Sequence, residues 1–211
     1  MLSRRLIIFT LLIIMILAIS CGHKEKPKPI VIVPVPEELQ PVIIRQIDAI
    51  LDYALDNDGL IEDSLRLDYI SNVSSFFEWS GKNRIWGEDR HWQPIADSMM
   101  GMLDSAKYYG LYAEDYYINN LKEIVLALKD TAKQKDAALW ARGELLFSNA
   151  FIHMAHDLHV GRLEADSTTL KKNWELNDSF YHAIFNQLMV QASPKKILES
   201  LEPRIPEYDS L

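Results

Sequence analysis

The side chains best placed to act together chemically lie in the segment His153-Met-Ala-His156-Asp157. Residues three and four positions apart share one face of an α-helix, so His153, His156 and Asp157 are candidate ligands for a single metal ion. His159 points about 240° away from His153 around such a helix and cannot join this face. The segment also lacks the glutamate of the H-E-x-x-H zinc-hydrolase motif. We therefore favour a hydrogen-bonded or solvated rim, and we expect no metal and no cofactor.

Carboxylate pairs offer a second kind of chemistry, because glycoside hydrolysis uses two carboxyl groups that flank the scissile bond. Glu88 and Asp89 are adjacent in sequence, as are Glu114 and Asp115, and only the fold decides whether either pair meets another acid. A lytic, muramidase-like helical domain therefore stays open as an alternative. The sequence contains neither a G-x-S-x-G nucleophile motif nor a glycine-rich phosphate loop.

Cys21 is the clearest candidate for covalent chemistry, since a secretory signal precedes it. Met1–Arg5 carries two arginines, and Leu6–Ile19 is almost entirely aliphatic. This apolar stretch of about fourteen residues is shorter than the ~20 residues that span a bilayer as a helix. Because Ala18-Ile-Ser-Cys21 is similar to a lipobox, residues 1–20 are predicted to be a lipoprotein signal peptide, and lipid-modified Cys21 the mature N-terminus. The alternative is an ordinary anchor helix with an incidental cysteine.

The cysteine count and the charge exclude several classes of function. Cys21 is the only cysteine, which rules out an intramolecular disulfide and leaves no cysteine nucleophile or cysteine metal cluster in the folded part. The chain has 22 Lys and Arg, two of them in the signal, against 30 Asp and Glu. This acidic balance disfavours nucleic acid and anionic lipid headgroups as electrostatic partners. The lipid anchor is the expected link to the membrane.

Residues 21–36 comprise the lipidated cysteine and a proline-rich tether. Four prolines in Gly22–Pro36 disfavour a helix and favour extended polyproline-like structure. At about 3 Å per residue, the tether would hold the folded body roughly 40 Å from the bilayer. The remaining residues, 37–211, suit one domain.

The hydrophobic pattern of this domain is helical throughout, with apolar residues at spacings of three and four. Pro94 fits the first turn of a helix, and Gly110 and Gly161 fit helix C-termini. Strand-type alternation is hardly visible, so the pattern predicts an all-α body of about six or seven helices around a long central one. The expected helices are Glu37–Leu55, Leu65–Phe77, Gln93–Tyr109, Tyr116–Lys129, Lys135–His159, Phe180–Gln191 and Pro194–Leu201.

Four stretches of the chain together carry a family resemblance: Phe76–Trp86 (FFEWSGKNRIW), Leu103–Tyr116 (LDSAKYYGLYAEDY), Leu146–Leu163 (LFSNAFIHMAHDLHVGRL) and Ile197–Leu211 (ILESLEPRIPEYDSL). In this order they resemble the all-helical scaffold domain of large L,D-transpeptidases, which are cell-wall enzymes of Gram-negative bacteria. The resemblance covers about Leu39–Leu211, nearly the whole mature chain.

The distinctive residues of these stretches suit structural roles. We expect Trp86 and Trp174 to fill the helical core. Asp115 is expected to cap the helix that begins near Tyr116. The resemblance therefore predicts the fold first.

In that family the scaffold is followed by a peptidoglycan-binding module and by a catalytic domain. The catalytic domain carries a histidine and a nucleophilic cysteine in an S-x-G-C-x-R-type motif. This chain ends at Leu211, where the family's scaffold ends, and its one cysteine is assigned to the lipid. The resemblance therefore implies that these residues do not carry out the family's acyl transfer.

Two classes of function follow. We favour a membrane-anchored, non-catalytic scaffold module of an L,D-transpeptidase-like peptidoglycan-crosslinking system, including a truncated or split transpeptidase. The alternative is a peptidoglycan-active enzyme, either as part of a longer natural chain or through a carboxylate pair. We expect the body in the periplasm of a Gram-negative bacterium, with peptidoglycan or a separate transpeptidase catalytic subunit as partner and no nucleic acid.

Overall fold

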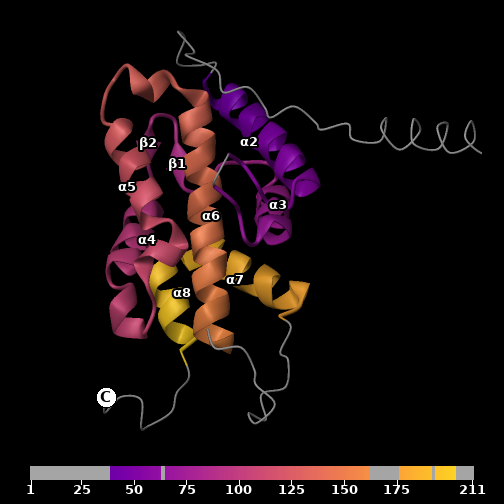
Figure 1. Cartoon of the computed structure of the whole chain (residues 1–211), viewed down its shortest axis with the longest axis vertical. Helices are drawn as coiled ribbons and strands as arrows, with labels where there is room; N and C mark the ends of the chain where they lie inside the picture. Colours follow the sequence, from indigo (N-terminus) through magenta and orange to yellow (C-terminus); the bar gives the residue numbers. More distant parts are fainter. Residues whose placement is uncertain (1–38, 63–64, 162–175, 192, 203–211) are drawn as a thin grey trace, which may run out of the picture.

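The computed structural model of the chain describes residues 39–62, 65–161, 176–191 and 193–202. These residues form seven α-helices and one short hairpin (Figure 1), which confirms the predicted all-α class. The predicted signal peptide, residues 1–20, the tether, residues 21–36, and Trp174 lie outside the described residues and stay predictions. Among the described helices, none is long and apolar enough to cross a membrane.

The fold is built around α6, Ala137–Val160, whose 24 residues span about 36 Å. Apolar or small side chains lie on nearly every face of this helix, so neighbouring helices can cover it all round. Asp136 caps its start, because Asp136 Oδ1 accepts hydrogen bonds from the N–H groups of Ala138 (3.0 Å) and Leu139 (3.1 Å).

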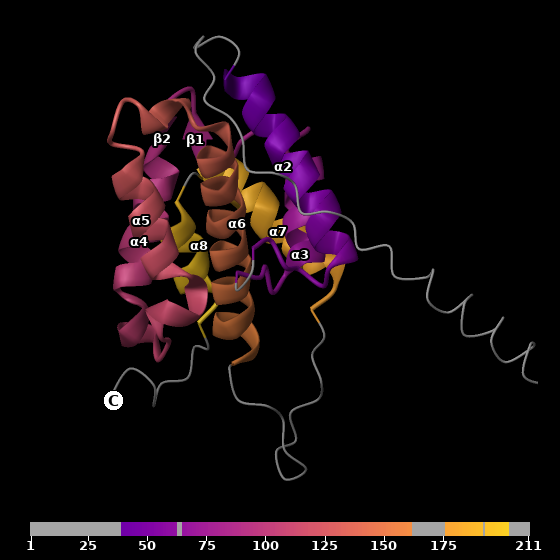
Figure 2. The same cartoon turned by 45° about the horizontal axis from the view of Figure 1, so that its top comes forward.

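The other helices pack around α6. Helices α2 (Leu39–Asp56) and α3 (Ile70–Trp79) lie on one side of α6, and α4 (Pro94–Asp104) and α5 (Ile118–Ala127) lie on the other (Figure 1). Helix α7 (Asp178–Gln191) packs against α3 and α8, and α8 (Pro194–Ser200) packs against α4 and α6 (Figure 2). All described helices thus share one core.

Helix α3 begins at Ile70, and the predicted start at Leu65 is wrong. Gly59, with φ of 82°, turns the chain, and the Leu67 N–H then donates to the Gly59 carbonyl oxygen (2.8 Å). The Ile61 N–H donates to the Leu65 carbonyl oxygen (2.8 Å). Leu65 and Leu67 are both buried, a spacing of two that belongs to extended chain. From the sequence, this extended segment was assigned to the helix that follows it.

The predicted helix Gln93–Tyr109 divides into two parts. Helix α4 ends at Asp104, and a 3₁₀ helix, η2 (Ala106–Tyr109), continues the segment. Gly110 ends η2 in the left-handed conformation with φ of 71°, which confirms its predicted role as a terminator.

The predicted capping role of Asp115 is wrong. Asp115 lies inside a second 3₁₀ helix, η3 (Ala113–Tyr116), and α5 begins only at Ile118. The N-cap of α5 is Tyr117, with φ of 60° and no side-chain hydrogen bond to the helix. The extra 3₁₀ turn carries the helix start beyond the position that Asp115 could cap.

A small hairpin joins α3 to α4 and has no counterpart in the predicted elements. Strands β1 (Gly87–Glu88) and β2 (His91–Trp92) pair antiparallel, with Gly87 opposite Trp92. Two residues per strand are too few to show an alternating pattern in sequence. The Trp92 ring lies against Trp140 of α6, with 4.7 Å between ring centroids, and this contact fixes the hairpin to the core.

Candidate functional site

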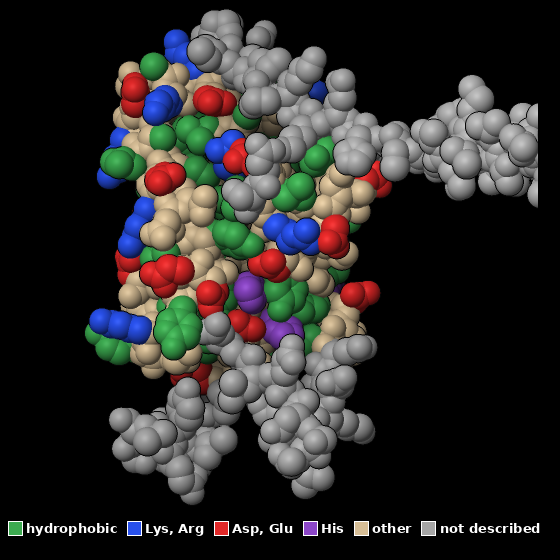
Figure 3. Space-filling view, in the orientation of Figure 1, with side chains coloured by type: hydrophobic (Ala, Val, Ile, Leu, Met, Phe, Trp, Pro, Cys, Tyr) green, Lys and Arg blue, Asp and Glu red, His purple; other side chains and the backbone are tan. Residues whose placement is uncertain are grey.

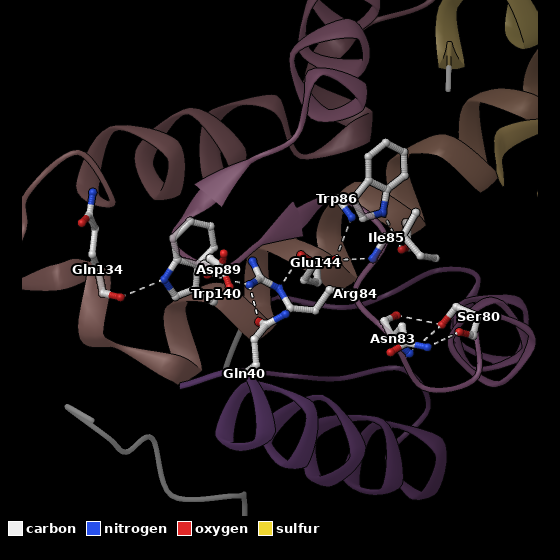
Figure 4. Close-up of polar contacts among 11 residues, drawn as sticks. Gln40, Ser80, Asn83, Arg84, Ile85, Trp86, Asp89, Gln134, Trp140 and Glu144 are labelled. Atoms are coloured by element: carbon white, nitrogen blue, oxygen red, sulfur yellow. Dashed lines mark hydrogen bonds and ion pairs between the residues drawn. The ribbon is translucent and has the colours of Figure 1, made fainter. Parts of the chain in front are cut away.

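The loop that follows α3 folds back on itself before it enters the core. Ser80 Oγ donates to the Phe77 carbonyl oxygen (2.7 Å), and the Asn83 N–H donates to Ser80 Oγ (3.0 Å). Asn83 Nδ2 donates to the Ser80 carbonyl oxygen (2.8 Å). Gly81 and Lys82 both have positive φ, 67° and 59°, so the chain reverses here. The turn directs the next three residues toward α6 (Figure 4).

These three residues are held by one carboxylate of α6. Arg84 Nε donates to Glu144 Oε1 (2.9 Å), while the N–H groups of Ile85 (3.1 Å) and Trp86 (3.0 Å) donate to Glu144 Oε2 (Figure 4). The side chains of Arg84 and Glu144 are only 1% and 5% exposed. Trp86 is fully buried, as predicted. Both oxygens of Glu144 therefore have internal donors.

The same ion pair connects α2 and the hairpin to α6. Arg84 Nη1 donates to Gln40 Oε1 of α2 (2.6 Å) and to the Asp89 carbonyl oxygen of the hairpin (2.9 Å). The guanidinium carbon lies 4.7 Å from the centre of the Trp140 ring. Burial raises the pKa of the Glu144 carboxyl, and Arg84 with the two backbone N–H groups works against that rise. This arrangement holds α2, the hairpin and α6 together, and Arg84 Nη2 is buried without a hydrogen-bond partner among the described residues.

The structure brings His153, His156 and Asp157 together near the C-terminal end of α6. Asp157 Oδ1 lies 3.1 Å from His156 Nδ1, and Asp157 Oδ2 lies 3.4 Å from His153 Nε2. The Tyr116 hydroxyl also donates to Asp157 Oδ2 (2.7 Å). The carboxylate is thus surrounded by its own neighbours, and the described part of the chain contains no group of three or more His, Cys, Asp or Glu that could hold a metal.

His153 is enclosed by aromatic rings. Its ring centroid lies 5.1 Å from that of Tyr69 and 4.8 Å from that of Tyr116. His153 Nδ1 is buried without a hydrogen-bond partner, 3.8 Å from Asp68 Oδ2. Burial lowers the pKa of His153, although the carboxylates of Asp157 and Asp68 oppose the change. We call Tyr69, Tyr116, His153, His156 and Asp157 the His153 cluster. Figure 3 shows histidine side chains, in purple, beside acidic and hydrophobic ones on the face that it draws.

The His153 cluster joins three distant segments of the chain. The Tyr69 N–H, at the start of α3, donates to Asn149 Oδ1 of α6 (3.0 Å). Next to Tyr116, the Tyr117 hydroxyl donates to Asp68 Oδ2 (2.7 Å). Hydrogen bonds from His156 and Tyr116 hold the pKa of Asp157 below its usual range against the opposing effect of burial. The cluster is therefore hydrogen-bonded, and its bonds run inward to the fold.

The two predicted carboxylate pairs lie far from each other. Glu88 and Asp89 belong to the hairpin, which packs on Trp140, whereas Glu114 and Asp115 belong to η3, next to Asp157. Trp140 and Asp157 are separated by roughly 25 Å along α6 at 1.5 Å per residue. The paired acids of a glycosidase lie about 5–10 Å apart, so the two pairs cannot form one such site.

His159 lies apart from the cluster, as its position on the helix predicts. Its ring is 5.0 Å from that of Phe180 in α7. Cys21, the predicted lipid-attachment site, lies outside the described residues.

The sequence analysis did not predict the contacts of the two polar centres, the Arg84–Glu144 pair and the His153 cluster. The reasons differ between the two. Glu144 did carry a signal, because it is a charged residue within the most apolar stretch of α6. Asp68 and Tyr69 carried none, since their partners are 49 and 80 residues away. No spacing rule connects residues at such separations.

Comparison with known proteins gives one match. A family model described as Scaffold domain matches residues 71–211. No curated protein and no solved structure matches the chain. The matched range contains the Arg84–Glu144 pair and all four stretches on which the family resemblance rests, and it contains the His153 cluster except for Tyr69.

Proposed function

Because the chain belongs to the Scaffold domain family, we propose that it is a membrane-anchored, non-catalytic module in an L,D-transpeptidase-like system that cross-links peptidoglycan. In this role it positions a separately encoded catalytic subunit, the cell wall, or both at a membrane of the envelope. The observation that carries the proposal is the family match over residues 71–211. The link to L,D-transpeptidases comes from the order of the four stretches in the sequence.

The described polar centres support a structural role. The Arg84–Glu144 pair is buried, and its members bond to each other, to the backbone and to Gln40. In the His153 cluster, Asp157 is bonded to Tyr116 and His156. Catalysis needs a group that can reach substrate in the right protonation state, and these groups are used to hold helices together.

The anchor part of the proposal comes from the sequence. The basic start, the short apolar stretch and Cys21 suit a lipoprotein signal, which would hold the body in the periplasm. A single lipid-modified N-terminus and an extended tether would let one scaffold reach partners within a limited distance of the membrane.

A reconstituted cross-linking assay tests the proposal. The full lipidated chain is placed in vesicles with purified muropeptide substrates, alone or together with a separately purified L,D-transpeptidase that has its catalytic cysteine. We expect no cross-linked product from the chain alone and a higher rate of product formation when both proteins share the vesicle. A catalytic-cysteine-to-alanine variant of the transpeptidase is the matched control.

Two results would contradict the proposal. Cross-linked product from the chain alone, or release of soluble fragments from sacculi, would favour the alternative of a peptidoglycan-active enzyme. An unchanged transpeptidase rate in the presence of the anchored chain would remove the scaffold role in cross-linking.

A further inference from the structure

His153 lies between two carboxylates that belong to different parts of the chain. Its Nε2 is 3.4 Å from Asp157 Oδ2 on the same helix, and its Nδ1 is 3.8 Å from Asp68 Oδ2 in the segment before α3. Each of these oxygens also accepts a hydrogen bond from a tyrosine. Tyr116 donates to Asp157 and Tyr117 donates to Asp68, both at 2.7 Å. Two consecutive tyrosines thus bond to the same two carboxylate oxygens that approach the imidazole ring.

Neutral His153 fits this place, and protonated His153 does not. Its side chain is 19% exposed, and Nδ1 is buried without a hydrogen-bond partner in the described structure. A protonated imidazole carries an N–H donor on both nitrogens. At 3.8 Å, Asp68 Oδ2 is too far from Nδ1 to accept the new donor. Protonation would therefore leave a charge and an unpaired donor inside the fold, which costs free energy.

Charged and titratable groups approach the ring from several elements. They are Arg66, Asp68 and Tyr69 before α3, Asp115 and Tyr116 in η3, Tyr117 at the start of α5, His156 and Asp157 in α6, and Tyr181 in α7, which is near Asp157. Burial has the largest effect on the pKa of His153 and outweighs the attraction of Asp157 and Asp68. Burial also raises the pKa of Tyr69 and Tyr117, so both hydroxyls stay protonated near neutral pH. Histidine is the side chain whose charge changes between pH 5 and 8.

The Asp68–Tyr117 bond is the part of this enclosure that can change most easily. The Asp68 side chain is 40% exposed, and a shift of about 1 Å would bring its carboxylate to hydrogen-bond distance from Nδ1. Tyr117 has φ of 60°, a conformation that is strained for a bulky residue. It is the N-cap of α5, and its carbonyl oxygen accepts from the Leu121 N–H (3.0 Å). His153, by contrast, is fixed on the central helix.

We propose that Asp68 exchanges partners with pH: it holds Tyr117 while His153 is neutral, and it pairs with His153 once that ring is protonated. The exchange releases Tyr117 and loosens the first turn of α5, while the Tyr116–Asp157 bond keeps η3 on α6. The cluster is then an acid-sensitive switch at the junction of η3 and α5. This switch goes beyond the scaffold role and holds whether or not that role is correct.

Double-mutant cycles test the exchange, with urea denaturation of the full lipidated chain in mild detergent at pH 7.5 and pH 5.5. Asp68→Asn and Tyr117→Phe, alone and combined, measure the coupling between these residues. We expect a coupling of roughly fivefold in the unfolding equilibrium constant at pH 7.5, as for one hydrogen bond, and almost none at pH 5.5. A second cycle, Asp68→Asn with His153→Gln, should show the opposite: almost no coupling at pH 7.5 and a severalfold coupling at pH 5.5.

The ion pair between Asp104 and Lys122 is the matched control, because it is exposed, joins α4 to α5 and contains no histidine. The coupling between Asp104→Asn and Lys122→Met should be the same at both pH values. The proposal is overturned if the Asp68–Tyr117 coupling is absent at pH 7.5 or unchanged at pH 5.5, or if the control coupling falls equally. A coupling between Asp68 and His153 that does not grow at pH 5.5 also overturns it. Should His153→Gln fail to fold, the Asp68–Tyr117 cycle decides alone.

Discussion

At the residue scale, the most demanding position in the described structure is Glu144. Its carboxylate is buried in the middle of α6, yet it receives the Arg84 side chain and the N–H groups of Ile85 and Trp86. A single side chain thus accepts hydrogen bonds from a buried cation and from two backbone N–H groups. Removing it would leave Arg84 Nε and the two backbone N–H groups without their acceptor and the buried guanidinium without its counter-charge, which is expensive.

Replacing Glu144 should therefore destabilise the domain strongly. Glu144→Leu is expected to lower the free energy of unfolding by about 3–5 kcal/mol, measured by urea denaturation followed by circular dichroism. The double variant Arg84→Met/Glu144→Leu should recover part of this loss because no buried charge remains. Lys82→Met, which removes exposed ion pairs with Asp48 and Glu78, should change little. Equal effects of Glu144→Leu and Lys82→Met would contradict the assigned role of the pair.

His153 should make stability depend on pH. Burial holds its pKa below the ordinary value of 6.5, so the unfolded chain takes up a proton more readily than the folded one. The free energy of unfolding should then be level above about pH 6.5 and fall as the pH drops below it. The low pKa of Asp157 places the loss of its contribution at still lower pH.

Urea unfolding of the wild type at pH 7.5 and pH 5.5 measures this effect. His153→Gln should reduce the difference between the two values, and His91→Gln, at an exposed residue of the hairpin, should leave it unchanged. A His153→Gln variant with the full wild-type pH dependence would show that another group is responsible.

At the element scale, the spacing of apolar residues predicts the helices. The connections between helices have no such pattern and could not be predicted in this way. Helix α6 was predicted to within two residues at its start, because its pattern is long and Gly161 ends it. The two-residue strands and the 3₁₀ turns around Gly110 are too short to produce a periodic signal. The conformation of these connections depends on residues that are distant in sequence. Glu144 of α6, for example, binds the segment that leads into the hairpin, and this contact is seen only in the folded structure.

Two glycines test how tightly the hairpin is held to α6. A Cβ on Gly87 would lie 2.1 Å from Arg84 Nη2, whereas a Cβ on Gly101 of α4 would meet nothing within 4 Å. Gly87→Ala should therefore lower the melting temperature, and Gly101→Ala should raise stability by about 0.5–1 kcal/mol through helix propensity. The account of the hairpin would be wrong if Gly87→Ala were as stable as the wild type.

At the scale of the whole molecule, the sequence predicted the fold class and the family better than it predicted a site. The order of four stretches agrees with the Scaffold domain match over residues 71–211. The face formed by His153, His156 and Asp157 was also predicted, but its inward bonds depend on Tyr69 and Tyr116 from other elements.

The anchor prediction can be checked on the mature protein. Mass spectrometry of the purified membrane-bound form should show an N-terminus at Cys21 that carries diacylglycerol. A Cys21→Ser variant should lack this modification and should leave the membrane fraction after signal cleavage or remain uncleaved. An unmodified Cys21 in the membrane-bound wild type would favour the alternative of a plain anchor helix.

Muropeptide analysis of cells tests the proposed function most directly. Deleting the gene should lower the fraction of muropeptides that carry L,D-transpeptidase cross-links, because the catalytic subunit loses its anchored scaffold. The wild-type chain should restore that fraction, and the Cys21→Ser chain should not. An unchanged cross-link profile in the deletion strain would contradict a role for this scaffold domain in peptidoglycan cross-linking.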